Sequence, residues 1–236
     1  MEGFTYTNIF ETKGIEYLVI ISFFAVLIPV WLIMNRKTKQ QVKNGKLAGF
    51  ITADSIRIPQ GLFFSKYHTW AYLGSNGEAK VGLDDFLLRF TGEVTINHIK
   101  KPGEKIKKGD VLTLINKNGK NLRILSPISG EIQKANSSVF ENHTALSTDP
   151  YKLGWMYSIK PSNWKTETNS YYLAEDATNW AKQELERFKD FLSVSLTKYM
   201  PQPVQVVLQD GGEIVDHALA ELPEEIWDEF QDKFLN

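Results

Sequence analysis

The longest apolar run of the chain lies near its N-terminus. Residues 17–34 contain no charged side chain, and twelve of these eighteen residues are Leu, Ile, Val or Phe. As a helix the run would extend about 27 Å, close to the hydrocarbon thickness of a bilayer. Its composition favours insertion by roughly 4–7 kcal/mol. Tyr17 and Trp31 lie near its two ends, where amphipathic rings prefer the membrane interface. The pattern predicts one membrane-spanning helix over residues 15–35.

The charges that flank this run predict a retained anchor with one orientation. Glu2 and Glu11 precede the run, whereas a signal peptide would begin with basic residues. Arg36, Lys37 and Lys39 follow it, and basic residues favour the cytoplasmic side of a membrane. We therefore expect a single pass through the cell's inner membrane. Residues 1–14 would lie outside, residues 36–50 would form a basic tether, and the remainder would be cytoplasmic.

Short β-type runs separated by turn signals fill residues 51–164. Strands are expected at 68–73, 78–83, 93–99, 111–115, 121–125, 130–133 and 155–159. Strands of this length and spacing predict a mainly β fold, either a flattened barrel or a sandwich. One short helix is expected between strands at residues 84–90, because Phe86, Leu87 and Phe90 recur at helical spacing.

Residues 165–236 change to an α-rich pattern and predict a C-terminal extension. Residues 176–199 form an amphipathic helix with Trp180 and Phe188 near one face and Asp176 as its cap. A further strand is expected at residues 204–208. A last helix is expected after Pro223, which suits a first helical turn.

The last helix has an apolar stripe opposite an acidic face. Ile226, Phe230 and Phe234 repeat every four residues, with Trp227 beside them. Two interpretations are open. Docking on the chain's own domain is favoured, and insertion into a groove on a partner protein is the alternative.

Composition excludes several classes of function. A hydrophobic content of 42% is ample for a core, and the formal charge of −1 gives no reason to expect nucleic acid. Without cysteine there is no disulfide, thiolate zinc site or cysteine-ligated iron–sulfur cluster. The four histidines, which have no metal-ligand spacing, are His68, His98, His143 and His217. We predict neither a metal site nor catalytic residues.

A tight hairpin is the clearest local motif of the β-rich part. Asn118-Gly119 separates two β-type runs, and both residues tolerate the positive φ that a type I′ turn requires. Lys117 and Lys120 flank these two turn residues. Alone, this pattern is typical of an ordinary hairpin with solvated lysines.

Six motifs in register resemble a known family. They are Tyr67-His68-Thr69-Trp70, Val81-Gly82-Leu83-Asp84-Asp85-Phe86, Pro102-Gly103-Glu104, Lys108-Gly109-Asp110, Ser126-Pro127-Ile128-Ser129-Gly130-Glu131, and Asp149-Pro150-Tyr151 with Gly154-Trp155. Over about 100 residues, 61 to 159, this series resembles the H protein of the glycine cleavage system. The resemblance implies a lipoyl-domain fold of the single-hybrid type. It also implies a hairpin-tip lysine that carries lipoate, with the cofactor supplying the chemistry.

The position expected to hold that lysine is Gly119. The resemblance places the lysine nine residues after Asp110 and seven before Ser126, and both counts reach Gly119. Glycine has no amine for the amide bond, so we expect no lipoate. Lys120 and Lys117 are the fallback candidates, although a one-residue shift along a hairpin turns a side chain to a different face.

The resulting prediction is a non-catalytic, membrane-anchored H-protein-like subunit without lipoate that acts as a scaffold or docking module. Its expected partners are the lipid bilayer and other proteins, with a membrane-bound redox or respiratory complex as host by analogy. The alternative is a lipoyl carrier that shuttles aminomethyl groups and is modified at Lys120 or Lys117. A third possibility is a protein that holds lipoate without a covalent bond.

Overall fold

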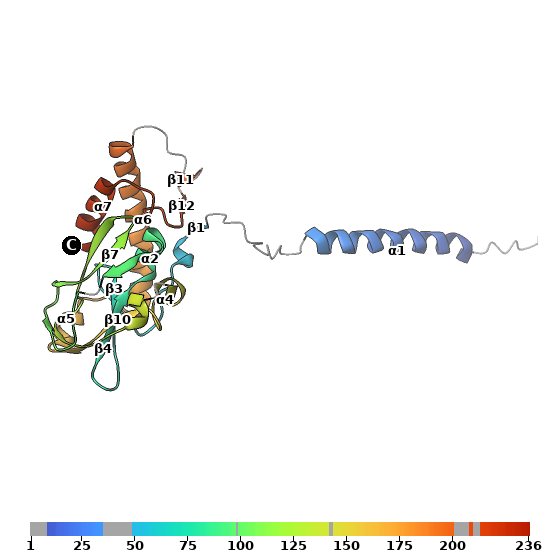
Figure 1. Ribbon diagram of the computed structural model, residues 1–236. Coiled ribbons are helices and arrows are strands. Elements are labelled where there is room, and N and C mark those ends of the chain that lie inside the picture. The colour runs from blue at the N-terminus through green and yellow to red at the C-terminus, as the bar shows by residue number, and fades with distance from the viewer. Residues whose placement is uncertain (1–8, 35–48, 98, 142–143, 201–207, 210–212) are drawn as a thin grey trace, which may run out of the picture. The chain divides into compact units, whose positions relative to one another are not determined.

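The computed structural model describes residues 9–34, 49–97, 99–141, 144–200, 208–209 and 213–236. It divides into two compact units, Met1–Lys46 and Leu47–Asn236, which we describe separately. The first unit holds one helix, and the second holds the sheets and the other helices (Figure 1). The tether expected at residues 36–50 lies almost wholly outside the described residues, as does the N-terminal segment 1–8.

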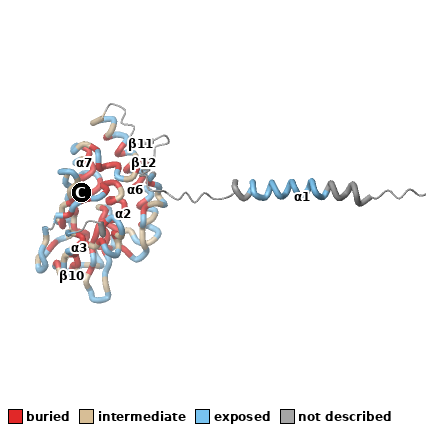
Figure 2. The backbone as a smooth tube through the Cα atoms, turned by 45° about the vertical axis from the view of Figure 1, so that its right-hand side comes forward, coloured by how far each residue is buried: buried red, intermediate tan, exposed pale blue. Residues whose placement is uncertain are grey.

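Helix α1, Ile9–Met34, contains the apolar run but begins before it. It therefore includes Glu11, Lys13 and Glu16 in its first turns. Its described side chains, residues 17–31, are exposed along their whole length (Figure 2). Among the described residues, no helix combines the length and the apolarity needed to cross a membrane. The spanning helix expected at 15–35 is thus not supported.

Two antiparallel sheets form the body of the larger unit. The six-stranded sheet has the order β2 (Phe63–Phe64), β3 (Thr69–Leu73), β4 (Ala79–Leu83), β10 (Trp155–Pro161), β9 (Gly130–Ala135), β6 (Lys105–Ile106). The three-stranded sheet has the order β5 (Thr95–Asn97), β7 (Val111–Lys117), β8 (Lys120–Leu125). The two sheets have no strand pairing in common and do not close into a barrel. The sandwich is therefore right and the closed barrel wrong.

The helices of this unit are short except for one. They are α2 (Asp85–Thr91), α3 (Ser137–Glu141), α4 (Thr144–Thr148), α5 (Trp164–Thr168), α6 (Ala174–Tyr199) and α7 (Glu224–Phe230), which continues as the π-helical segment η2 (Gln231–Leu235). A 3-10 turn, η1, spans Ala53–Ser55. The expected helix at 84–90 is confirmed as α2. Asp84 caps it, since one carboxylate oxygen accepts a hydrogen bond from the Leu87 amide at 2.9 Å.

A third, small sheet joins the start and the end of this unit. It has the order β1 (Phe50–Ile51), β12 (Glu213–Val215), β11 (Leu208–Gln209). The strand expected at residues 204–208 lies outside the described residues except for Leu208, which begins β11. Phe50 pairs with Val215, more than 160 residues later, so only the tertiary fold creates this sheet.

Helix α6 begins two residues earlier than its sequence indicates. The capping position is Leu173, and Asp176, expected as the cap, lies in the first turn beside Glu175. Carboxylates in a first turn stabilise a helix through its dipole rather than through a capping hydrogen bond. The helix ends at Tyr199, one residue before Met200, as expected.

The C-terminal extension packs on the chain's own domain. Ile226, Trp227, Phe230 and Phe234 are buried to within 1% of full burial and join the same core as both sheets. Helix α7 is also held to α6 by Glu229. Its carboxylate accepts hydrogen bonds from side chains of α6, and these donors lower the pKa of Glu229 to about 2; the donors are Lys198, Tyr199 and Ser195. The interpretation that favoured self-docking is confirmed.

Candidate functional site

The candidate site is built around the β7–β8 hairpin. Strand β7 pairs with β8 so that Lys117 lies opposite Lys120, with Asn118 and Gly119 forming the two-residue turn. The φ angles of Asn118 and Gly119 are 53° and 87°, both in the left-handed region that a type I′ turn requires. The predicted hairpin is confirmed, including its turn residues.

Gly119 lies at the tip of the hairpin and faces open space. A Cβ atom built at this position would meet no other atom within 4 Å. A side chain would therefore fit here without a clash, at the modest cost of a positive φ. The tip has room for a Cβ atom, but glycine supplies no side chain.

Lys120, one of the two fallback candidates, is held by the C-terminal extension. Its ammonium group donates hydrogen bonds to the backbone oxygens of Ala220 at 2.8 Å and Leu222 at 2.7 Å. It also lies 5.1 Å from the centre of the Trp227 ring. Burial lowers the pKa of Lys120, the charge of Glu221 partly offsets this, and the charge of Lys117 lowers it further. The amine is thus engaged within the chain.

Gln231 of the C-terminal extension also covers part of strand β8. Strand β8 is an edge of its sheet, so one side of its backbone lacks a neighbouring strand. The Gln231 amide oxygen accepts from the Arg123 N–H at 2.6 Å, and its nitrogen donates to the Arg123 oxygen at 3.3 Å. One side chain therefore pairs with the edge as a neighbouring strand would.

Lys117, the other fallback candidate, lies opposite Lys120 on the other strand of the hairpin. It is half-buried at the end of β7. The structure thus brings Lys117, Gly119 and Lys120 together within one turn. Of the two amines, the one on β8 is enclosed by the extension.

A second cluster of buried charge lies around His68. Its φ is 58°, and its side chain is fully buried. The Nδ1 atom is 2.9 Å from Asp84, and the Nε2 atom is 3.3 Å from Glu184 of α6, without the alignment of a hydrogen bond. The ring stacks on Phe86 at 4.4 Å.

The charge of His68 is set by these carboxylates. Burial lowers the pKa of His68, but the charge and hydrogen bond of Asp84, followed by the charge of Glu184, outweigh burial and raise it to about 9. At neutral pH the imidazolium thus links Asp84, the cap of α2, to Glu184 of α6. The geometry therefore gives His68 a packing and charge-pairing role.

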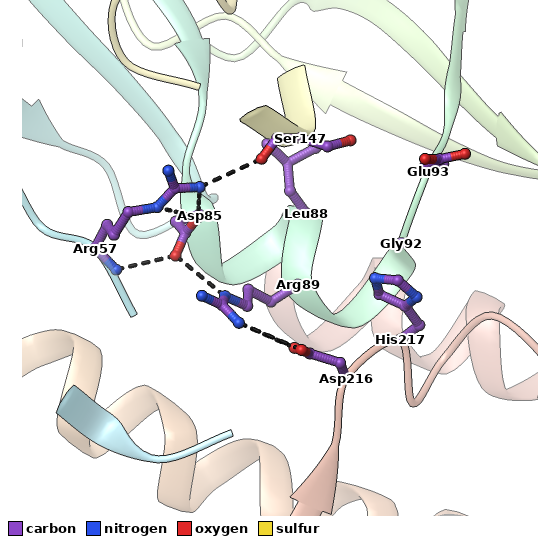
Figure 3. Close-up of a pocket in the computed structure, with 9 residues that line it drawn as sticks. All are labelled: Arg57, Asp85, Leu88, Arg89, Gly92, Glu93, Ser147, Asp216 and His217. Carbon is purple, nitrogen blue, oxygen red and sulfur yellow. Dashed lines mark hydrogen bonds and ion pairs between the residues drawn. The ribbon is translucent and has the colours of Figure 1, made fainter. Parts of the chain in front are cut away.

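A third cluster lines a cavity of about 300 Å³ beside α2 (Figure 3). The buried Asp85 carboxylate accepts from the Arg57 guanidinium at 2.6 and 3.0 Å and from the Arg57 amide at 2.9 Å. Arg89 reaches the same carboxylate at 3.4 Å and Asp216 at 3.2 Å.

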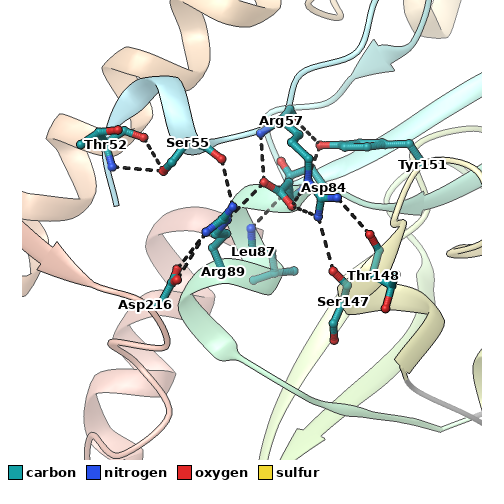
Figure 4. A network of polar contacts seen from close by, with 11 residues as sticks. Thr52, Ser55, Arg57, Asp84, Leu87, Arg89, Ser147, Thr148, Tyr151 and Asp216 are labelled. Atoms are coloured by element: carbon teal, nitrogen blue, oxygen red, sulfur yellow. Dashed lines mark hydrogen bonds and ion pairs between the residues drawn. The ribbon is translucent and has the colours of Figure 1, made fainter. Parts of the chain in front are cut away.

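Further donors of these arginines reach backbone oxygens (Figure 4). Arg57 donates to the backbone oxygen of Thr148 at 3.0 Å, and Arg89 donates to that of Ser55 at 3.1 Å. The Tyr151 hydroxyl accepts from the Asp85 amide and donates to the Arg57 oxygen. Because each guanidinium group bonds to several partners within the chain, the network fastens segments of the fold together.

The other candidate residues are dispersed. The Ser126 hydroxyl donates to the Ile128 oxygen, and Ser129 bonds to Glu167, so neither has a histidine base. His217 packs against Gly92, near the Arg89 network. His98, His143 and the Asp210-Gly211-Gly212 turn lie outside the described residues. Within the described part of the chain, no group of three or more His, Asp or Glu side chains could hold a metal ion.

Sequence reasoning missed Gln231, Glu184 and the Arg57–Asp85 pair. Gln231 and Glu184 belong to helical patterns in which a polar residue indicates a solvated face. The one available signal was that each interrupts an apolar stripe. Pairing across more than 100 residues, as between Arg123 and Gln231, leaves no local pattern.

The fold and the hairpin define the class of protein. It is a two-sheet domain of the lipoyl-carrier type, with a projecting hairpin that a C-terminal extension covers on one side. The family model described as glycine cleavage H-protein matches residues 62–184, just over half of the chain. This chain belongs to the glycine cleavage H-protein family.

Curated relatives agree with this assignment. The chain is 26% identical over 132 residues to a probable glycine cleavage system H protein of Pyrococcus abyssi, covering 56% of this chain and 98% of that protein. A similarly named protein of Thermococcus gammatolerans is 29% identical over 125 residues, covering 53% of this chain and 92% of that protein. A solved H protein of Mycobacterium marinum is 22% identical and covers 54% of this chain and 98% of that one, with a TM-score of 0.45.

The boundaries of the family match are informative for the site. Lys120 and Gly119 lie inside it, whereas Ala220, Leu222 and Gln231, which cover the hairpin strand, lie outside. The cover over β8 is therefore an addition to the matched domain.

Proposed function

We propose that this chain is a non-catalytic H-protein-like subunit that carries no lipoate and acts as a docking module for other proteins. The observation that carries the proposal is the hairpin. Its tip residue, Gly119, has no amine, and the neighbouring Lys120 amine is hydrogen-bonded to two carbonyls of the extension. A carrier arm needs a free amine for loading and free space for swinging. The extension also provides a rigid support for the domain.

Lipoylation can be tested directly. We expect the full-length chain, incubated with lipoate, ATP and a lipoate ligase, to gain no mass, because no free amine occupies the tip. Intact-mass spectrometry of this sample and of chain purified from its native host measures the result. A Gly119→Lys variant is the positive control, because a Cβ at this position meets no atom within 4 Å.

The alternative, a lipoyl carrier modified at Lys117 or Lys120, makes the opposite prediction. An adduct on the native chain that is lost in Lys117→Arg or Lys120→Arg would replace the docking role with a carrier role. Calorimetric titration with lipoamide tests non-covalent binding, and we expect no heat of binding.

The proposal includes attachment to a membrane through residues 9–34 and a membrane-bound redox complex as host. Support comes from the sequence between Tyr17 and Trp31, whose apolar side chains are exposed on all sides of α1. A helix that is apolar all round needs apolar surroundings.

Fractionation tests this part of the proposal. We expect the chain to sediment with membranes after an alkaline carbonate wash and to be released by mild non-ionic detergent, together with its partner complex. A variant that begins at residue 47 is the matched control and should remain in the supernatant. Recovery of the full-length chain in the carbonate supernatant would contradict the membrane attachment.

A further inference from the structure

The outer face of the six-stranded sheet carries a row of lysines. Directly paired residues of neighbouring strands point to the same face of a sheet. The register therefore aligns two rows of side chains. The first row crosses β3, β4, β10 and β9 and consists of Tyr72, Lys80, Ser158 and Lys134. The second row crosses β10, β9 and β6 and consists of Lys160, Glu131 and Lys105.

The opposite face of the same sheet is the core, so only the outer face can meet a partner. Val81, Ile132 and Ile159 on the inner face are completely buried. Helix α6 covers one end of the outer face, where Trp70 packs over Gly82 and shares an apolar cluster with Trp180. Beyond that end the two rows are exposed, apart from Ser158.

The charge of this face is strongly one-sided. It carries four lysines, and its carboxylates are Glu131 and the half-buried Glu78, which accepts a hydrogen bond from Ser158. The whole chain has a formal charge of −1, whereas this face has two more lysines than carboxylates. Acidic side chains are instead exposed on α7, at Glu224, Glu225 and Asp228. A cationic face on a near-neutral chain favours an acidic partner.

Two cavities interrupt the same face. One, of about 480 Å³, is lined by Lys105, Lys107 and Lys160 together with Glu131. The other, of about 300 Å³, has aromatic and aliphatic walls and two ammonium groups; its lining residues are Leu62, Trp70, Tyr72, Lys80, Tyr151 and Lys152.

The second cavity has the features of a specific anchor site. Tyr72 at its mouth is 47% exposed, and the buried indole N–H of Trp70 has no hydrogen-bond partner among the described residues. An aromatic wall flanked by lysines suits an apolar side chain with neighbouring carboxylates.

We propose that this outer face is the docking surface for an acidic partner protein. The partner inserts an apolar side chain into the cavity between Trp70 and Tyr72 and lays carboxylates along Lys80, Lys134 and Lys160. The inference rests on the proposed docking role and names the surface that performs it. From β3 to β6 four interstrand spacings of about 4.8 Å span about 19 Å, which an extended segment of roughly six residues can cross.

A short acidic peptide tests the surface. The probe is a fluorescein-labelled octapeptide, Glu-Phe-Asp-Glu-Gly-Asp-Glu-Glu, titrated with the full-length chain in non-ionic detergent and followed by anisotropy. We expect saturable binding that weakens as salt rises, because exposed charge pairs are screened. The double variant Lys80→Glu/Lys152→Glu should lose at least tenfold in affinity, and Lys160→Glu should lose about threefold.

Matched controls separate this surface from general charge effects. Lys233→Glu, on the C-terminal extension, changes the net charge by the same amount as Lys160→Glu and should leave the affinity unchanged. Replacing Phe of the peptide with Ser should weaken binding if the cavity takes an apolar side chain.

Several outcomes would overturn the proposal. These are no saturation at millimolar chain, equal affinity of the Lys80→Glu/Lys152→Glu variant, or lysine-dependent binding to phosphatidylserine vesicles instead of the peptide. The lipoylation assay is an independent measurement. A lipoyl adduct would remove the unlipoylated role, whereas failure of peptide binding would remove only this surface.

Discussion

Trp227→Ala is expected to lower the free energy of unfolding by about 3–5 kcal/mol, the range for truncating a buried aromatic side chain. Trp227 is 1% exposed and belongs to the core formed by both sheets and the extension. Its indole N–H donates to the Leu219 oxygen at 2.7 Å, so truncation also removes one of the two hydrogen bonds that this oxygen accepts, the other coming from the Leu222 N–H at 3.1 Å. The ring further supports the Lys120 ammonium group.

Urea unfolding monitored by circular dichroism measures this effect. Asp228→Ala is the matched control, since Asp228 is the exposed neighbour on the same helix and its loss should change stability by less than about 0.5 kcal/mol. A loss below 1 kcal/mol for Trp227→Ala would show that the extension is not part of the cooperative fold.

Raising the pH from about 6 to 9.5 is expected to destabilise the chain by about 3 kcal/mol through His68. The folded-state pKa of His68 is about 9, against an ordinary value of 6.5. The folded state therefore binds the proton more tightly than the unfolded state does. The stabilisation that His68 contributes is fully present below pH 6.5, its ordinary pKa, and is lost as the pH rises through its folded-state pKa of about 9.

The variant His68→Asn isolates this contribution. Asparagine tolerates the left-handed backbone at this position, where φ is 58°, but does not titrate. The buried Asp84 would then lack its cation, whereas Glu184 keeps its ion pair with Arg187 at 3.1 Å. Because Asp84 is left unpaired, we expect a loss of about 3–5 kcal/mol at pH 6 and a flatter pH profile.

A series of urea unfolding curves between pH 6 and 9.5 makes the comparison. Above this window the folded state is also affected by Tyr151 and Tyr171, whose pKa values burial raises. Glu184→Gln should give an intermediate profile, since it leaves Asp84 as the partner of His68. Parallel pH profiles for the native chain and His68→Asn would contradict the assignment of the charge.

Local elements of this protein were predictable because short-range chemistry dictates them. Asn118-Gly119 can adopt the positive φ angles of a type I′ turn, so the hairpin and its register followed from two residues. The motifs between Tyr67 and Trp155 likewise indicated the family, which the comparisons confirm. By contrast, Asp176 was wrong as the cap of α6, because the helix begins at Ala174 with Leu173 at the capping position and without a side-chain capping hydrogen bond.

The family, the strands, the hairpin and the missing amine at its tip could all be predicted from the sequence, since each depends on residue identity or close spacing. What covers the hairpin could not, because it depends on contacts between distant segments of the chain. Lys120 meets Ala220 and Leu222 about 100 residues later, and Gln231 meets Arg123 at a similar separation. The cationic face depends equally on register, which brings Lys105 and Lys160 to either side of Glu131. Such contacts form because burial of the shared core brings distant segments together. They cannot be predicted from the spacing of apolar residues along the chain.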